Sequence, residues 1–94
     1  MTMEHEVRRD DAGSRYELLV DGRVVGVADF VVAGTAVVVP HTEIDAARRG
    51  AGLGALLVEG VLADIRAQGR TVVPTCWYVR QYMAEHPETA DLLA

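Results

Sequence analysis

The sequence contains no lysine and a single cysteine, and each shortage excludes a class of protein. All 9 basic residues are arginines, and they face 14 aspartates and glutamates, so the formal net charge is −5. An acidic chain without a basic stripe is a poor nucleic-acid binder, because phosphate contacts supply most of that affinity. The lone Cys76 excludes an internal disulfide framework and a multi-cysteine zinc site. His5, His41 and His86 are far apart, so we predict no metal site.

Long apolar runs are also missing. Although 50% of the residues are apolar, no run approaches the ~20 residues that a membrane span needs. The segment Met1–Arg9 is charged where a secretory signal would be apolar. We therefore expect a cytoplasmic protein that does not enter membranes. A chain of 94 residues is long enough for one domain with one modest core, so we expect a single domain spanning residues 1–94.

The first half of the chain has the signals of β-strands. We expect a short leading strand at Val7–Arg9 and three longer ones at Tyr16–Val20, Val24–Val32 and Ala36–Ile44. The tight turns at Asp21-Gly22 and Ala33-Gly34-Thr35 require neighbouring strands to pair antiparallel. Pro40 lies inside the last run and predicts an edge position or a β-bulge there.

The second half changes to helical periodicity. Leucine, valine and isoleucine recur on one face between residues 53 and 65, which predicts a helix over 52–68 that ends before Gly69. We then expect a strand at Thr71–Val73, a helix at Trp77–Glu85 that stops before His86-Pro87, and a last turn at Glu88–Leu93. The expected fold is mixed α+β. It combines an antiparallel meander, a parallel strand pair joined by a helix, and a C-terminal helix.

A glycine-rich loop lies where the long helix begins. Gly50, Gly52 and Gly54 remove side chains from the backbone, and Arg48 and Arg49 add positive charge. Free N–H groups and the helix dipole then favour one bound anion, such as a pyrophosphate. The segment also matches the dinucleotide pattern G-x-G-x-x-A, but the next strand does not end in the acidic residue which that motif uses. A nucleotide or NAD binder remains an alternative, as does a flexible loop that binds nothing.

These residues resemble the GNAT superfamily of acetyl-CoA-dependent N-acetyltransferases. Arg49–Gly54 looks like the coenzyme-A motif of that superfamily. The ordered blocks His41–Ile44, Arg49–Gly52, Thr75–Tyr82 and His86-Pro87 resemble its short, single-domain NATD1-like group over residues 16–90. The resemblance implies two parallel strands that splay apart around acetyl-CoA. The implied coenzyme-binding residues are Ile44, Arg48, Arg49, Gly50, Ala51, Gly52, Leu53 and Gly54.

Acetyl transfer to an amine requires a base, and His41 and Glu43 are the first candidates. They are two residues apart on one strand, so regular geometry puts them on one face together with Val37 and Val39. Either side chain could deprotonate an ammonium group. The alternative is that both side chains are solvated at the end of a strand and have no catalytic role. The effect of Pro40 on which face of the sheet they occupy stays open.

Cys76 and Tyr82 are the other catalytic candidates. A thiol near a helix N-terminus gains thiolate character, so Cys76 could accept the acetyl group or exchange a proton. The alternative is a buried cysteine that acts as a small hydrophobe. The resemblance implies a tyrosine that protonates the coenzyme sulfur, and we assign that role to Tyr82. Trp77 and Tyr78 are expected to serve helix packing.

Together these observations predict an acetyl-CoA-dependent N-acetyltransferase with an unspecified amine acceptor. The full-length members of the superfamily carry helices after their first strand, and this chain has a turn there. A module that binds acyl-CoA or a protein partner without turnover is therefore the alternative. The sequence leaves monomer and homodimer open.

Overall fold

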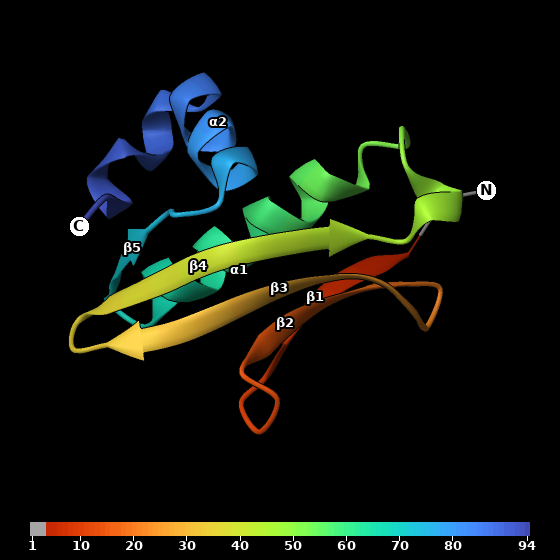
Figure 1. Cartoon of the computed structure of the whole chain (residues 1–94), viewed down its shortest axis with the longest axis horizontal. Coiled ribbons are helices and arrows are strands. Elements are labelled where there is room, and N and C mark those ends of the chain that lie inside the picture. The colour runs from red at the N-terminus through yellow and green to blue at the C-terminus, as the bar shows by residue number, and fades with distance from the viewer. Residues whose placement is uncertain (1–3) are drawn as a thin grey trace.

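The computed structural model describes residues 4–94 as a five-stranded mixed sheet with helix α1 against one face (Figure 1). The elements are β1 His5–Asp10, β2 Arg15–Val20, β3 Arg23–Ala33, β4 Ala36–Ile44, η1 Ala46–Arg48, α1 Leu53–Ala67, β5 Thr71–Val73, α2 Trp77–Glu85 and η2 Pro87–Leu92. Strands β1 to β4 pair antiparallel in chain order, and β5 pairs parallel with β4. The predicted mixed α+β fold is confirmed. The expectation for Met1–Arg9 lies partly outside the described residues.

The turns explain why the meander forms. Asp21 and Gly22 have φ angles of 49° and 82°, the positive values that a two-residue hairpin turn needs to match the twist of its strands. Gly34, between β3 and β4, has a φ of 63°. Both turns were predicted from their residue types, because Gly, Asn and Asp tolerate this backbone region best.

Helix α1 presents one apolar stripe to the sheet. Its buried residues are Leu53, Leu57, Val58, Val61, Leu62 and Ile65. Gly60 lies so close to Val7 of β1 that a Cβ at this position would clash with the valine side chain. The helix ends at Ala67, and Gly69, which follows the C-cap residue Gln68, has a φ of 70°. The N–H of Arg70 donates to the carbonyl of Ile65 at 3.2 Å, as in a Schellman cap.

A polar clamp fixes the meander to the same helix. Tyr16 of β2 is 1% exposed, and its hydroxyl donates to Asp64 of α1 at 2.7 Å. The same carboxylate oxygen accepts from Arg9 at 2.7 Å and from Gln68 at 2.7 Å. Burial, and then the hydrogen bond to Asp64, raise the pKa of Tyr16. These contacts hold β1 and β2 against α1.

Strand β4 contains a β-bulge at Val39 and Pro40. His41 pairs with Asp29 and Val38 pairs with Val31, so two residues of β4 lie opposite Phe30 alone. The bulge confirms the second of the two possibilities predicted for Pro40. A bulge adds one residue to a strand and thereby reverses which side chains face the core beyond it.

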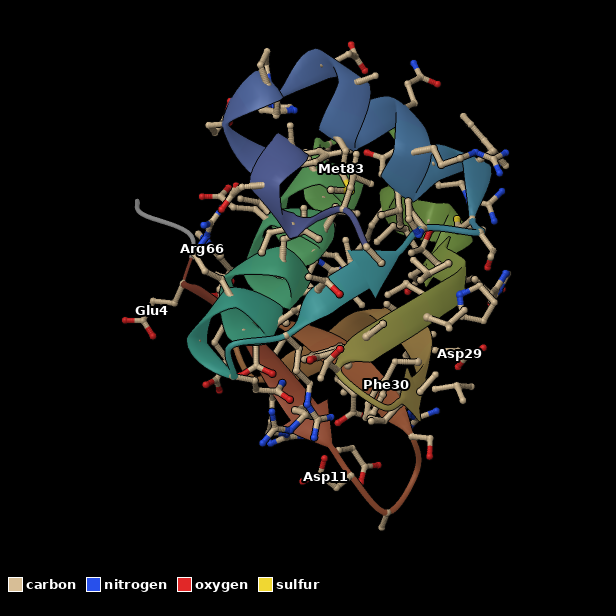
Figure 2. All side chains as sticks on the ribbon, turned by 90° about the vertical axis from the view of Figure 1, so that its left-hand side faces the viewer. Glu4, Asp11, Asp29, Phe30, Arg66 and Met83 are labelled. Carbon is tan, nitrogen blue, oxygen red and sulfur yellow. The ribbon has the colours of Figure 1, made fainter. Side chains whose placement is uncertain are left out.

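Strands β4 and β5 pair over a short stretch and then separate. Their pairing ends at Val38 and Val73. Beyond it, the N–H of Cys76 donates to the carbonyl of Val39 at 3.1 Å, and α2 begins. Val79 and Met83 are the buried residues of α2, and Met83 points toward α1 (Figure 2). Within residues 4–94, neither helix has the length and apolar character that a bilayer crossing needs.

The short η1 was not predicted. The Asp45 carboxylate accepts from the N–H of Ala47 at 3.1 Å and caps this turn. The N–H of Asp45 donates to the carbonyl of Val25 at 2.7 Å, which ties the start of the glycine loop to β3.

Candidate active site

A cleft of about 820 Å³ opens where β4 and β5 separate. Its walls come from the end of β4, the glycine loop, the first turn of α1 and the first turn of α2. Ten of the residues predicted for the site line this cleft: His41, Glu43, Ile44, Arg48, Arg49, Gly50, Gly52, Leu53, Gly54 and Cys76. Ala51 and Tyr82 do not line it. The fold therefore gathers most of the candidates that the sequence scatters over residues 41–76.

The glycine loop has a backbone that requires glycine. Gly50 and Gly52 have φ angles of 87° and 75°, and a Cβ at either position would meet nothing within 4 Å. Backbone conformation therefore selects these two glycines. Gly54 is selected by space instead, since its Cβ would lie 2.7 Å from the Tyr78 hydroxyl.

The start of α1 is left open to a ligand. Gly52 is the N-cap, and within the described chain no side chain caps this helix end. The first helical hydrogen bond runs from the N–H of Leu56 to the carbonyl of Gly52 at 3.4 Å. The earlier N–H groups of an α-helix have no partner inside the helix, so they remain free to bind an anion at the cleft.

Arginines surround this end of the cleft. Arg48 and Arg49 follow β4, and Arg80 lies on the first turn of α2. The Arg49 Nε donates to the carbonyl of Ile44 at 3.4 Å, and Arg80 donates to the carbonyl of Thr75 at 3.5 Å. The region is therefore positive beside the free helix end. Residues 4–94 contain no group of three or more His, Cys, Asp and Glu side chains placed to hold a metal ion.

His41 and Glu43 share a face, as predicted, but it is not the face of Val37 and Val39. The His41 Nε2 and Glu43 Oε2 atoms are 3.7 Å apart, and the two side chains are 56% and 62% exposed. The bulge puts Thr42 on the side of the buried valines instead, where it pairs with Ala28. The predicted common face was wrong because it continued a regular alternation through Pro40.

Cys76 is the N-cap of α2 and is 8% exposed. Its Sγ lies 3.6 Å from the Thr42 hydroxyl oxygen. Burial alone would raise the pKa of the thiol, but the N–H of Val79, the Thr42 hydroxyl and the N–H of Tyr78 favour the thiolate. Their sum exceeds the cost of burial, so the pKa of Cys76 lies below its ordinary value. The residue is thus a buried thiol with a lowered pKa at the wall of the cleft.

Tyr82 lies away from the cleft. It lines a second hollow of about 380 Å³ between α1, α2 and η2. Its ring stacks on His86, with the ring centroids 3.9 Å apart. Tyr78, one helical turn earlier, reaches the cleft in its place.

Six residues that were not among the predicted site residues also line the cleft: Pro40, Thr42, Thr75, Trp77, Tyr78 and Arg80. Trp77 is 64% exposed and meets Tyr78 edge to face, with ring centroids 5.8 Å apart. A sequence signal existed for three of them, because Trp77, Tyr78 and Arg80 follow Cys76 within the first turn of one helix. Thr42 could have been found from the bulge that Pro40 predicted.

Comparisons with known proteins agree on the fold. A family model described as GCN5-related N-acetyl-transferase matches residues 15–92. The crystal structure of the ribosomal-protein-S18-alanine N-acetyltransferase from Escherichia coli superposes with a TM-score of 0.65 at 13% identity, covering 82% of this chain and 53% of that one. A solution structure of a GCN5-like candidate N-acetyltransferase from Staphylococcus aureus gives 0.66 at 12% identity, covering 95% and 87%. No curated protein sequence matches significantly. The chain thus spans about half of the Escherichia coli enzyme.

Proposed function

Because this chain belongs to the GCN5-related N-acetyltransferase family, we propose that it transfers an acetyl group from acetyl-CoA to an amine. The observation that carries the proposal is the separation of β4 from β5 beyond Val38 and Val73, directly beside the uncapped start of α1. One cleft thereby combines an exposed strand edge, an anion-binding helix end and a thiol. We further propose the cytoplasm as its location, where a single free cysteine stays reduced.

The residues of the cleft suit coenzyme A. In the proposal, the free N–H groups at the start of α1 and the arginines 48, 49 and 80 hold the pyrophosphate. On the side away from β3, the stretch of β4 from His41 to Ile44 has no neighbouring strand among residues 4–94. The N–H and C=O groups that point to that side are therefore free to pair with the pantetheine amides. Acetyl-CoA supplies the activated acyl thioester. All other steps fall to this chain's own side chains.

Proton removal from the acceptor is assigned to the pair of His41 and Glu43. An amine is protonated at neutral pH and must lose a proton before it can attack. The two side chains lie within 3.7 Å of each other at the outer part of the cleft, where an acceptor can reach them. His41→Gln and Glu43→Gln should each lower turnover with little change in coenzyme affinity. The pH–rate profiles of the two variants identify the base.

Proton delivery to the leaving thiolate is assigned to Tyr78 and not to Tyr82, the residue that the sequence predicted for this role. Tyr78 lines the cleft beside Gly54, whereas Tyr82 stacks on His86 in the second hollow. Tyr78→Phe should therefore reduce turnover, and Tyr82→Phe provides the matched control. Equal turnover of Tyr78→Phe and Tyr82→Phe would contradict the assignment of proton delivery to Tyr78.

Cys76 has two proposed roles, which one measurement separates. It either accepts the acetyl group or exchanges a proton with the reacting groups. The chain has one cysteine and no lysine, so intact mass spectrometry after incubation with acetyl-CoA has an unusually simple outcome. An added acetyl group that hydroxylamine removes, and that Cys76→Ala abolishes, identifies a thioester on Cys76. An acetyl adduct on the Cys76→Ala variant that resists hydroxylamine is instead an amide. Because the chain has no lysine, that amide lies on the N-terminal amine.

The test of the proposal is thermal stability with acetyl-CoA, CoA, NAD and ATP at equal concentrations. A ligand at 100 times its Kd stabilises the folded state by about 2.7 kcal/mol, which is several degrees for a domain of this size. Shifts with both coenzyme A forms but not with NAD support the cleft assignment. Selective stabilisation by NAD supports the dinucleotide alternative, and no shift at all contradicts the proposal.

An acceptor screen then decides between enzyme and binding module. The segment between β1 and β2 is a turn over residues 11–14, so no helix from this region walls off an acceptor. Coenzyme binding without acetylation of a broad panel of peptides, polyamines and small amines would favour the non-catalytic alternative. The acceptor is unassigned in this proposal, and the likeness to the NATD1-like group stays a prediction.

A further inference from the structure

The candidate bases lie on the face of the sheet that is turned away from α1, which we call the open face. Ala28 and Phe30 of β3 belong to the core that α1 covers, and Asp29 between them is exposed on the open face (Figure 2). His41 pairs with Asp29 in the register of β3 with β4, so it shares that face, and Glu43 follows it two residues later. An acceptor that reaches the two bases therefore approaches over the open face.

Asp29 offers these bases a neighbouring carboxylate that has no positive partner. Residues directly opposite each other in an antiparallel pair have Cβ atoms about 4.5–5.5 Å apart, and His41 stands opposite Asp29. Within residues 4–94, Asp29 forms no ion pair, and Glu43 forms one only with His41, at 3.7 Å. Both carboxylates are thus available to a cation that arrives from outside the chain.

The arginines on the open face are engaged with a different carboxylate. Arg15 of β2 lies opposite Asp29, but its guanidinium donates to Glu17 at 2.9 Å. Arg8 of β1 donates to the same glutamate at 3.1 Å. Two guanidinium groups therefore share Glu17, and neither forms an ion pair with Asp29.

The charge around the candidate bases is negative when every strand of the meander is counted. The two cross-strand rows that contain His41 and Glu43 hold four carboxylates and two guanidinium groups between β1 and β4. The arginines 48, 49 and 80 line the cleft, where the coenzyme pyrophosphate is proposed to bind. An excess of carboxylates attracts cations, so this approach to the cleft favours a positively charged acceptor.

We propose that Asp29 is a specificity-determining residue, which binds a second positive charge of the acceptor and thereby selects a short diamine over a monoamine. The inference rests on the proposed acetyl transfer and names the class of its acceptor. Three or four carbon atoms separate two nitrogens by about 5–6 Å, since each bond is about 1.5 Å long, and this matches the spacing of His41 and Asp29. One nitrogen gives its proton to the bases and forms the amide as the coenzyme leaves as its thiol. The other nitrogen keeps its proton and its ion pair.

A pair of acceptors with the same carbon chain tests the role of Asp29. Trimethylenediamine carries two amines and propylamine carries one, so only the diamine can use a second carboxylate. Asp29→Asn should lower kcat/KM for the diamine about three- to fivefold, as expected for an exposed ion pair, and should do so through KM. The kinetics of propylamine should stay unchanged. A folded Asp29→Asn variant with wild-type kinetics on the diamine, or with equal losses on both amines, overturns the inference.

Two further variants separate a local ion pair from net charge. Asp29→Glu keeps the carboxylate and should retain most of the selectivity for the diamine. Glu85→Gln removes a carboxylate at an exposed site on α2 and should leave the kinetics of both amines unchanged. A loss of diamine selectivity in Glu85→Gln as large as that in Asp29→Asn would contradict a specific contact with Asp29.

Binding measured by NMR distinguishes failure of this inference from failure of acetyl transfer. In the presence of CoA, titration with trimethylenediamine should shift the backbone amides around Asp29 and His41, and Asp29→Asn should raise the Kd of the diamine but not that of propylamine. Diamine binding that depends on Asp29, without any acetylation, would support the specificity of the site and contradict the proposed function. Acetylation of both amines that is insensitive to Asp29 would overturn this inference alone.

Discussion

Gly52 lies in the loop that we propose binds coenzyme A, and its replacement by alanine tests that proposal. Gly52 has a φ of 75° and a Cβ there would meet nothing within 4 Å, so Gly52→Ala changes backbone preference without a steric clash. The left-handed conformation costs an L-residue about 1–2 kcal/mol. If alanine relaxes in the free protein and must return to bind the coenzyme, the affinity for CoA falls by roughly 5- to 30-fold.

Gly34→Ala is the matched control. Gly34 has a φ of 63°, its Cβ would also meet nothing within 4 Å, and it lies in the β3–β4 turn, outside the cleft. Both variants should lose up to about 1–2 kcal/mol of folding stability, at roughly 4–8 °C of Tm per kcal/mol. Calorimetric titration with CoA should show weaker binding in Gly52→Ala alone. Equal affinities in the two variants would refute the assignment of this loop to the coenzyme.

Three further predictions follow from contacts described above. Thr42→Val removes a hydroxyl that favours the Cys76 thiolate, so the pH midpoint of iodoacetamide alkylation should move upward; an unchanged midpoint would contradict that contact. Gly60→Ala should destabilise the fold by about 1–3 kcal/mol in urea titrations despite alanine's higher helix propensity, since its methyl group would clash with the valine of β1. Tyr16 has a raised pKa in the folded state, so its contribution to stability is complete below its unfolded pKa of about 10 and declines as pH rises above it. Tyr16→Phe should therefore be less stable at neutral pH, because it loses the bond to Asp64, yet lose less stability between pH of about 9 and 11.

The fold was predictable because each of its elements has a strong local cause. Alternating apolar residues and turn residues with tolerated positive φ define the meander, and Gly69 marks the end of α1. The gathering of the glycine loop and Cys76 into one cleft was predictable from the implied splay of two parallel strands. The short η1 was not, because one turn of 3₁₀-helix has no periodicity to detect.

Two details of the site required coordinates. Periodicity places Tyr78 and Tyr82 on the same face of α2 but does not tell which turn meets the cleft, and four residues of α-helix span about 6 Å. Pro40 indicated a bulge, but the face of the sheet that His41 and Glu43 occupy depends on which of the two paired strands carries the extra residue. The register with β3 answers that question.

The bulge in β4 also changes how the strand tolerates insertion, deletion and substitution. Val37 and Val39 are buried before it, and Thr42 and Ile44 follow on their side after it. Odd-numbered residues of β4 therefore face the core before the bulge and solvent after it. Removal of one residue at the bulge would turn His41 and Glu43 toward the core side of the sheet and would expose Thr42 and Ile44. Substitution of His41 or Glu43, whose side chains are exposed, leaves the core intact. Length at this point of the chain is therefore under tighter constraint than residue identity.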